Sequence, residues 1–292
     1  MITVENEWLK VNIESHGAEL RKVKHKKNGL NYMWSGDNKY WGRVSPVLFP
    51  IVGRLKDDQY QIDGKTYQMS QHGFLRDVEF KVLEQTATNA AFVFDSAGRF
   101  SDVYPYEFKA IIRYMLQEDT LIVHWEIVNE NEKEMHFSIG AHPAFKIPLL
   151  ESETIEDYHI HFTPAEDMSV MEYELQNSLL HEKGKVNDIG TLPLTHSLFA
   201  NDALVYSNID KITLVSNKSS YGVEVMFKNF PFVGIWSKYL EEDGSIAPFV
   251  CIEPWYGVAD TYDTVGDFKE KFGVNRLKPS ETFQTEYNIK FI

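Results

Sequence analysis

Short runs of alternating apolar and polar residues, separated by polar turns, fill most of this chain. Residues 120–128 alternate in this way and lead into the polar segment 129–132, a pattern that predicts a strand entering a hairpin. Because successive side chains of a strand point to opposite faces, such a run indicates a strand with one buried face. Similar runs occur at residues 60–69, 90–94, 110–116, 211–215 and 281–291.

Helical signals are few and short. The best covers residues 267–272 and stops at Gly273, as a C-terminal glycine cap would dictate. Helices do not alternate with strands, so a parallel α/β sheet is disfavoured. The turn-rich segments 149–157 and 176–196 are flanked by strand-like runs and are not typical linkers. We therefore expect an all-β fold, one large antiparallel β-sandwich domain over residues 1–292 with a few short helices.

Composition limits the partners of this chain. Its 292 residues are 43% hydrophobic and 14% aromatic, enough for a sizeable core, and the formal charge of −14 would repel nucleic acid. No segment approaches a membrane span, and residues 1–7 lack the pattern of a secretory signal. The single cysteine, Cys251, cannot form an intramolecular disulfide, so we expect a reducing cytoplasm. The sequence leaves open whether the chain acts alone or as a homodimer.

Two charged or titratable residues lie near the first glycine-marked segments. Arg54 follows an apolar run, where it either faces a site or pairs with one of the aspartates at positions 57 and 58. His72 precedes Gly73, and a glycine lets the backbone turn sharply and leaves the imidazole room to face a cavity. Both residues are candidates for a site.

Two further candidates stand at the ends of apolar strands. Pro143 holds His142 in an extended conformation and removes one ladder hydrogen bond, so the strand must end or bulge there. Glu253 ends the apolar run 248–252, where a buried carboxylate is costly unless it has partners or a shifted pKa. Such a shift is typical of a general base, whereas the alternative is a salt bridge at the strand end.

Cys251 lies two residues before Glu253 and therefore on the same face of the strand. We expect it to pack as a small hydrophobe rather than to act as a nucleophile. His72, His142 and Glu253 have the residue types of a zinc triad. They lack the close helical spacing of many metal sites, and no phosphate-binding glycine loop occurs, so we expect neither metal nor cofactor.

Taken in order, these segments resemble the aldose 1-epimerase family, and more closely its LacX-like bacterial branch. The resemblance rests on Arg54, the Asp-Gly hairpin at residues 62–67, the His-Gly-Phe element at 72–74, and the motifs at 141–145 and 250–254. Residues 199–204 resemble the element that carries a sugar-binding aspartate, here Asp202. Ala144 replaces a common aromatic and Gln71 a common leucine, departures that bear on hexose preference.

The resemblance implies a metal-free isomerase that interconverts the α and β anomers of an aldohexose. Glu253 would remove the proton from the C1 hydroxyl, His142 would protonate the ring oxygen, and His72 would donate it a second hydrogen bond. Arg54 and Asp202 would hold the hydroxyls, although the aspartates at 188 and 210 compete for that role. The apolar face of the sugar would stack on Trp236 or on the phenylalanine at 232.

Two other functions remain open. A hexose-6-phosphate 1-epimerase would need a basic cluster at the cleft, which Arg43, Arg76 and Lys238 could supply if the fold brings them together. A sugar-binding module or sensor could keep the same fold without turnover. Binding alone does not demand both an acid and a base, so the two histidines and Glu253 favour an enzyme.

Overall fold

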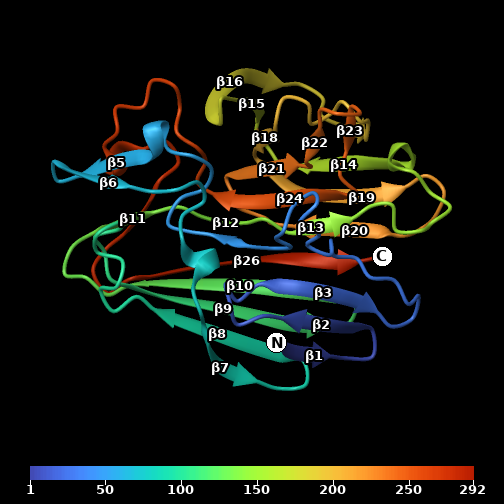
Figure 1. Ribbon diagram of the computed structural model, residues 1–292, viewed down its shortest axis with the longest axis horizontal. Helices are drawn as coiled ribbons and strands as arrows, with labels where there is room; N and C mark the ends of the chain where they lie inside the picture. The colour runs from blue at the N-terminus through green and yellow to red at the C-terminus, as the bar shows by residue number, and fades with distance from the viewer.

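The computed structural model describes residues 1–292 and consists mainly of antiparallel strands (Figure 1). One large sheet has nine strands, in the spatial order β17 (Thr191–Pro193), β14 (Tyr158–Pro164), β19 (Ile209–Ser216), β20 (Gly222–Met226), β26 (Thr282–Phe291), β10 (Thr120–Asn129), β9 (Phe108–Gln117), β8 (Asn89–Asp95) and β7 (Lys81–Gln85). The other has eight, in the order β16 (Leu179–Val186), β15 (Val170–Gln176), β18 (Leu204–Ser207), β21 (Phe232–Trp236), β24 (Phe249–Tyr256), β12 (Ile139–Ala141) and β4 (Val47–Leu48), with β13 (Ala144–Lys146) pairing separately to β24. The expected all-β antiparallel sandwich is confirmed.

Smaller sheets and single helical turns complete the fold. The strands β1 (Ile2–Glu5), β2 (Leu9–Ile13) and β3 (Leu20–His25) form one meander, and the two-stranded pairs are β5 (Gln59–Ile62) with β6 (Lys65–Gln68), β11 (Met135–Phe137) with β25 (Asn275–Leu277), and β22 (Tyr239–Leu240) with β23 (Ser245–Ile246). The helices are the 3-10 turns η1 (Lys56–Asp58), η2 (Leu75–Asp77), η3 (Ile155–Asp157) and η4 (Phe268–Glu270). None of them has the length and apolar character needed to cross a membrane.

Alternation along the strands places the core between the two large sheets. Leu121, Val123, Trp125 and Ile127 of β10 are almost fully buried, as the pattern of residues 120–128 predicts. Val250 and Ile252 of β24 belong to the same core, whereas the residues between and after them point to the opposite face of the sheet. In Figure 1, β24 lies above β26 and β10. Val250 and Ile252 face the core, so Cys251 and Glu253 lie on the opposite face of the strand.

Most sequence-based expectations for individual strands are confirmed, including the hairpin of β5 and β6 around Asp63 and Gly64, both with positive φ. The hairpin expected after residues 120–128 is wrong. Instead, the Asn129 side chain donates hydrogen bonds to the carbonyls of Lys133 and Leu277, and the chain continues into β11, which pairs with β25. The helix expected at 267–272 is a single 3-10 turn, and the turn-rich segment 176–196 contains the edge strands β16 and β17.

Candidate active site

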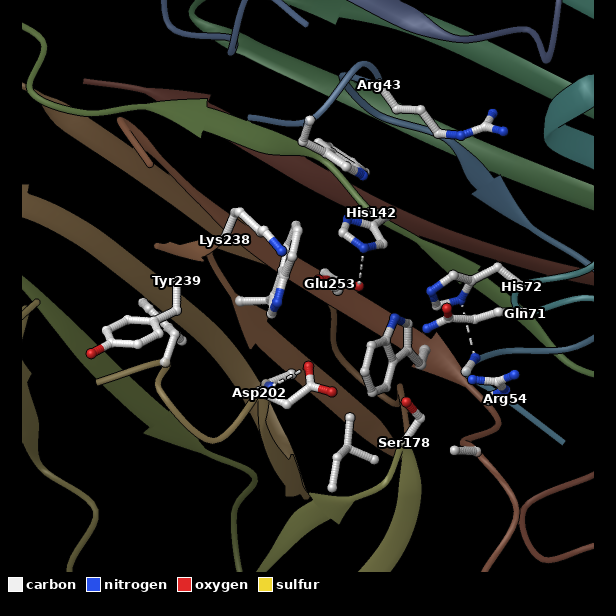
Figure 2. A pocket seen from close by; sticks show the side chains of 18 of the residues that line it. Arg43, Arg54, Gln71, His72, His142, Ser178, Asp202, Lys238, Tyr239 and Glu253 are labelled. Carbon is white, nitrogen blue, oxygen red and sulfur yellow. Dashed lines mark hydrogen bonds and ion pairs between the residues drawn. The ribbon is translucent and has the colours of Figure 1, made fainter. Parts of the chain in front are cut away.

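One cavity of about 710 Å³ opens on the face of the eight-stranded sheet opposite to the core (Figure 2). Its walls come from segments far apart in the sequence: loops around residues 40–54 and 71–76, the junction between β12 and β13, the ends of β15 and β21, and the outer face of β24. All six site residues expected from the sequence line it, namely Arg54, His72, His142, Asp202, Trp236 and Glu253.

Glu253 is placed by the register of β24. It pairs with Gly234 of β21, and its side chain is only 2% exposed although it borders the cavity. Gly234 leaves space for the neighbouring aromatic on β24, because a Cβ there would lie 2.2 Å from Cη2 of Trp255. Glu253 sits on a central strand, between β21 on one side and β12 and β13 on the other, and a group on such an element is well supported.

His142 reaches Glu253 from the neighbouring strand. β12 ends at Ala141, and Nε2 of His142 lies 3.3 Å from Oε2 of Glu253. Trp41 stacks on the imidazole at 4.7 Å between ring centroids, and Trp236 meets it edge-on at 5.7 Å. These two indoles fix the plane of the ring, while its Nδ1 is buried without a hydrogen-bond partner.

Burial shifts both groups toward their neutral forms. It raises the pKa of Glu253 well above its usual range, the negative charge of Asp202 raises it further, and the indole N–H of Trp255 opposes the shift. Burial also lowers the pKa of His142 to about 3, with a further contribution from Arg76. The pair thus holds one proton in common, and that proton can lie on the carboxyl or on the imidazole.

His72 adopts an unusual backbone conformation. Both His72 and Gly73 have a φ of +67°, and a Cβ at Gly73 would lie 2.2 Å from the carbonyl oxygen of Phe49. The backbone N–H of Gly53 donates to Nδ1 of His72 at 3.1 Å, so the neutral ring carries its proton on Nε2. Burial lowers the pKa of His72 well below its usual range, and its ring lies edge-on to His142 at 5.6 Å. His72 can therefore offer an N–H to a ligand.

The loop that contains Gly53 and Arg54 is held by a buried ion pair between Asp260 and Lys271, which the sequence did not predict. The backbone N–H of Asp260 donates to the carbonyl of Arg54 at 2.9 Å, and its Oδ2 accepts from the backbone N–H of Lys56 at 3.0 Å. Nζ of Lys271 lies 3.4 Å from Oδ1 of the same carboxylate, and both side chains are buried. Lys271 stands in the polar run 269–271, where nothing in the sequence marks it as buried.

Arg54 combines both alternatives that the sequence left open. It lines the cavity, yet its guanidinium makes two hydrogen bonds to the Asp58 carboxylate, at 2.8 and 2.6 Å, and is 46% exposed. Asp202 has a φ of +78°, and burial raises its pKa. Of the three competing aspartates, Asp202 is the one that lines the cavity, and of the two candidate aromatics it is Trp236.

Several lining residues were not assigned to the site from the sequence. Trp41 and Trp255 are aromatics that a sequence pattern cannot distinguish from core. Arg43, Arg76 and Lys238, which the sequence offered only for a phosphorylated sugar, line this same cavity. Burial and the nearby charge of Arg43 lower the pKa of Arg76 to about 10.

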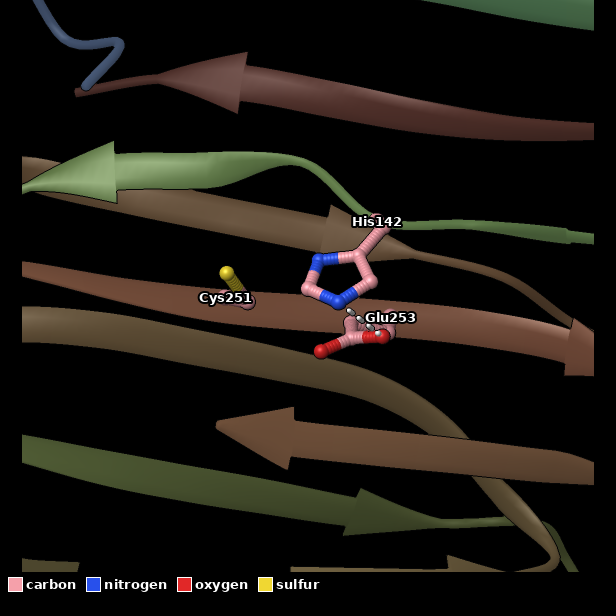
Figure 3. A group of neighbouring side chains, drawn as sticks. All are labelled: His142, Cys251 and Glu253. Carbon is pink, nitrogen blue, oxygen red and sulfur yellow. Dashed lines mark ion pairs between the residues drawn. The ribbon is translucent and has the colours of Figure 1, made fainter. Parts of the chain in front are cut away.

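A group of possible metal ligands lies at the back of the site (Figure 3). His142, Cys251 and Glu253 each offer a ligand atom, and these atoms lie within 4.8 Å of one another. The group differs from the triad considered from the sequence, because Cys251 takes the place of His72. Burial raises the pKa of the Cys251 thiol. That the protein needs no metal stays a prediction.

Comparison with known proteins places the chain in a family. The model of the aldose 1-epimerase family matches residues 1–271. The chain is 31% identical over 302 positions to the chromosomal protein LacX of Lactococcus lactis subsp. lactis, with 100% of this chain and 99% of that protein covered. Among solved structures, a galactose mutarotase related enzyme from Lactobacillus acidophilus superposes with a TM-score of 0.94 at 35% identity, covering 100% of this chain and 97% of that one. A galactose mutarotase-like protein from Lactobacillus casei ATCC 334 gives a TM-score of 0.90 at 30% identity, with 100% of both chains covered. The chain therefore belongs to the aldose 1-epimerase family.

Proposed function

We propose that this protein is an aldose 1-epimerase that interconverts the α and β anomers of an aldohexose. The observation that carries the proposal is the contact of His142 with Glu253, 3.3 Å apart, on the wall of a cavity large enough for a sugar. Opening a hemiacetal requires one group to remove the proton of the C1 hydroxyl and another to protonate the ring oxygen. Because these two oxygens are bonded to the same carbon, the acid and the base must lie close together.

In the proposed reaction, the Glu253 carboxylate accepts the C1 hydroxyl proton while His142 donates a proton to the ring oxygen. The ring bond breaks, the open-chain aldehyde rotates about the bond between C1 and C2, and reclosure returns both protons with the roles exchanged. His72 donates a hydrogen bond from Nε2 to the ring oxygen, a role that the N–H of Gly53 on Nδ1 supports. No proton is gained or lost over the cycle.

The protonation state of the pair fits this cycle. Burial favours a neutral carboxyl and a neutral imidazole. Transfer of the one shared proton from Glu253 to His142 creates the carboxylate and the imidazolium without exchange with solvent. The hydroxyls of a bound sugar can solvate both charges, so substrate binding itself would favour the reactive form.

The other lining residues would orient the sugar. The Asp202 carboxylate lines the cavity close enough to Glu253 to raise its pKa, which suits a hydroxyl of the same pyranose. Arg54 keeps N–H groups beyond those used by Asp58. Trp236 presents an indole beside the imidazole of His142, where the apolar face of a sugar would pack.

Polarimetry tests the proposal directly. Freshly dissolved α-anomers of a panel of hexoses should reach anomeric equilibrium faster with the protein than without it, and His142→Asn should remove most of the acceleration. A protein that binds these sugars, as detected by calorimetry, without accelerating mutarotation of any of them would instead be a sugar-binding module.

The cavity also favours a second candidate, a hexose-6-phosphate 1-epimerase. Arg43, Arg76 and Lys238 line the same cavity as Glu253, so this cavity contains basic groups that could bind a phosphate. Part of this charge is already used, because Arg43 pairs with Asp77 at 2.8 Å. The ratio of kcat/KM for a hexose 6-phosphate and for the free hexose distinguishes the two. A strong preference for the phosphorylated sugar that Arg76→Gln abolishes would select the second.

A further inference from the structure

We propose that His142, Cys251 and Glu253 also form a binding site for a thiophilic divalent cation such as Zn²⁺, and that this cation inhibits the enzyme by occupying the acid and the base. Of these three residues, the proposed reaction uses His142 and Glu253. Only Cys251 has no role in it. Binding of the cation does not depend on the proposed function, whereas the inhibition rests on it.

The spacing of the ligand atoms is close to that of a tetrahedral site. Zinc bonds of about 2.0–2.1 Å to nitrogen or oxygen and about 2.3 Å to sulfur place neighbouring ligand atoms roughly 3.3–3.7 Å apart. Nε2 of His142 and Oε2 of Glu253 are already 3.3 Å apart. All three ligand atoms lie within 4.8 Å of one another, so the thiol needs to move by only about 1 Å.

The thiol lies in a small buried cluster. Cys251 pairs across the sheet with Ala144, and the cluster also includes Trp34, Ala247 and Phe249. Movement of the thiol toward the imidazole therefore requires only a change of its own rotamer and small shifts of these neighbours. Figure 3 shows the sulfur of Cys251 beside the imidazole of His142, on the same side of β24 as the Glu253 carboxylate.

The charges of these three ligands suit a buried dication. A thiolate, a carboxylate and a neutral imidazole together carry two negative charges, which cancel those of the cation, and a net charge of zero lowers the cost of burial. The combination of His72, His142 and Glu253 would leave one positive charge uncompensated. His72 is also engaged, because its Nδ1 accepts the N–H of Gly53. Soft sulfur and borderline nitrogen ligands select zinc or cadmium over magnesium or calcium.

The cavity provides a route of entry and a fourth ligand position. His142 and Glu253 line it, whereas Cys251 lies behind them and is fully buried. A cation that enters from the cavity would meet the imidazole and the carboxylate first and the thiol last, with water completing the coordination. Once bound, it would occupy the Nε2 and Oε2 atoms that the reaction uses, so it should compete with the sugar.

Cadmium titration tests the site independently of catalysis, because a cadmium thiolate bond absorbs in the ultraviolet. With metal-stripped protein we expect this absorption to rise to one equivalent of Cd²⁺, and Zn²⁺ to remove it by competition. Cys251→Ala and Cys251→Ser should abolish the absorption. The matched control is His161→Ala, which disrupts the surface pair of His159 and His161 and should leave the absorption unchanged.

Inhibition by Zn²⁺ gives the second measurement. Wild-type protein should lose activity in polarimetry and regain it with chelator, while Cys251→Ala should keep its basal activity and need at least about tenfold more Zn²⁺ for half inhibition. Absence of the thiolate absorption in wild type, or equal inhibition of wild type and Cys251→Ala, would overturn the site. A protein that shows the absorption but no epimerase activity would keep the cation site and lose the proposed function.

Discussion

Two buried carboxylates, seven residues apart in the chain, have opposite surroundings. Glu253 and Asp260 are both 2% exposed. Asp260 faces the ammonium of Lys271 and accepts a backbone N–H from Lys56, whereas Glu253 faces a histidine whose pKa is lowered to about 3. Asp260 is therefore a buried charge with a cation to balance it, and Glu253 is a buried acid without one.

Because of this difference, the two carboxylates are suited to different roles. A buried carboxylate that is paired with lysine and hydrogen-bonded to backbone holds a fixed charge and a fixed position, which suits Asp260 to anchoring the loop of Arg54. A buried carboxylate without a cation has a raised pKa, so it holds its proton at a pH where an ordinary carboxylate is ionised, which suits Glu253 to proton transfer. The comparison predicts that substitutions at the two positions will change different measurements.

The largest expected effect is on catalysis by Glu253→Gln. Glutamine keeps the shape of the side chain and one acceptor oxygen but cannot accept a proton, so the rate of mutarotation should fall by on the order of a hundred- to ten-thousand-fold. Sugar affinity should change much less, by about 1.5–3 kcal/mol at most for one charged hydrogen bond. Polarimetry and calorimetry on the same preparation separate the two. Turnover close to wild type would remove the assignment of Glu253 as base.

The second prediction concerns stability and Asp260. Asp260→Asn would leave the buried ammonium of Lys271 without a counter-charge, and breaking a buried ion pair in this way costs about 3–5 kcal/mol. We expect urea unfolding to show a loss of this size, and Lys271→Met alone to show a similar one. The double variant should recover much of the loss, because it removes both charges. Additive losses in the double variant would show that the pair does not act as a unit.

The sequence predicted one of these carboxylates and missed the other for a physical reason. Glu253 ends an apolar run, so its local pattern alone marks a polar group in a buried place. Lys271 stands in the polar run 269–271, and its burial arises only when the chain folds back over Val258, whose carbonyl accepts a hydrogen bond from Nζ. Local alternation likewise predicted most strands, but not the path after β10, which depends on contacts with β25.

The same limit applies to the cavity. Arg54, His72, His142 and Glu253 are marked locally by a glycine, a proline or the end of an apolar run, so the sequence could select them before the fold was known, whereas Asp202 and Trp236 came from the family resemblance. The sequence around a residue does not show which distant segments will lie next to it in the fold. The sequence therefore suggested His72 as the third possible metal ligand, whereas the register of β24 and β13 places Cys251 beside His142.

The third prediction uses the pH dependence of stability. The carboxyl of Glu253 has a raised pKa in the folded protein, so its favourable contribution is fully present below its usual value near 4.5 and is lost as pH rises toward the folded value. Glu253→Gln removes this loss, so the variant should be more stable than wild type at neutral pH, by an amount that grows by up to about 1.4 kcal/mol per pH unit. Urea unfolding between pH 5 and about 8 measures the difference. If the difference in unfolding free energy between the variant and wild type stays constant with pH, Glu253 is ionised in the folded protein.

The smallest effect is expected for Cys251→Ser. The thiol lies beside Glu253 on the same strand face but has no part in the proposed reaction, so kcat and KM of the metal-free protein should stay within about twofold of wild type.

Serine brings a hydroxyl into the apolar surroundings of Trp34 and Phe249, which should cost about 1–3 kcal/mol of stability unless the hydroxyl finds an acceptor. Glu253 offers such an acceptor, since its charge is close enough to raise the pKa of the thiol. A hydrogen bond from the serine would stabilise the carboxylate, so the pH profile of Cys251→Ser should shift toward lower pH with little change in the maximum rate. A large fall in the maximum rate at every pH would instead make Cys251 a participant in the reaction, and the contrast between a proton-transferring Glu253 and an anchoring Asp260 would then have to include the thiol.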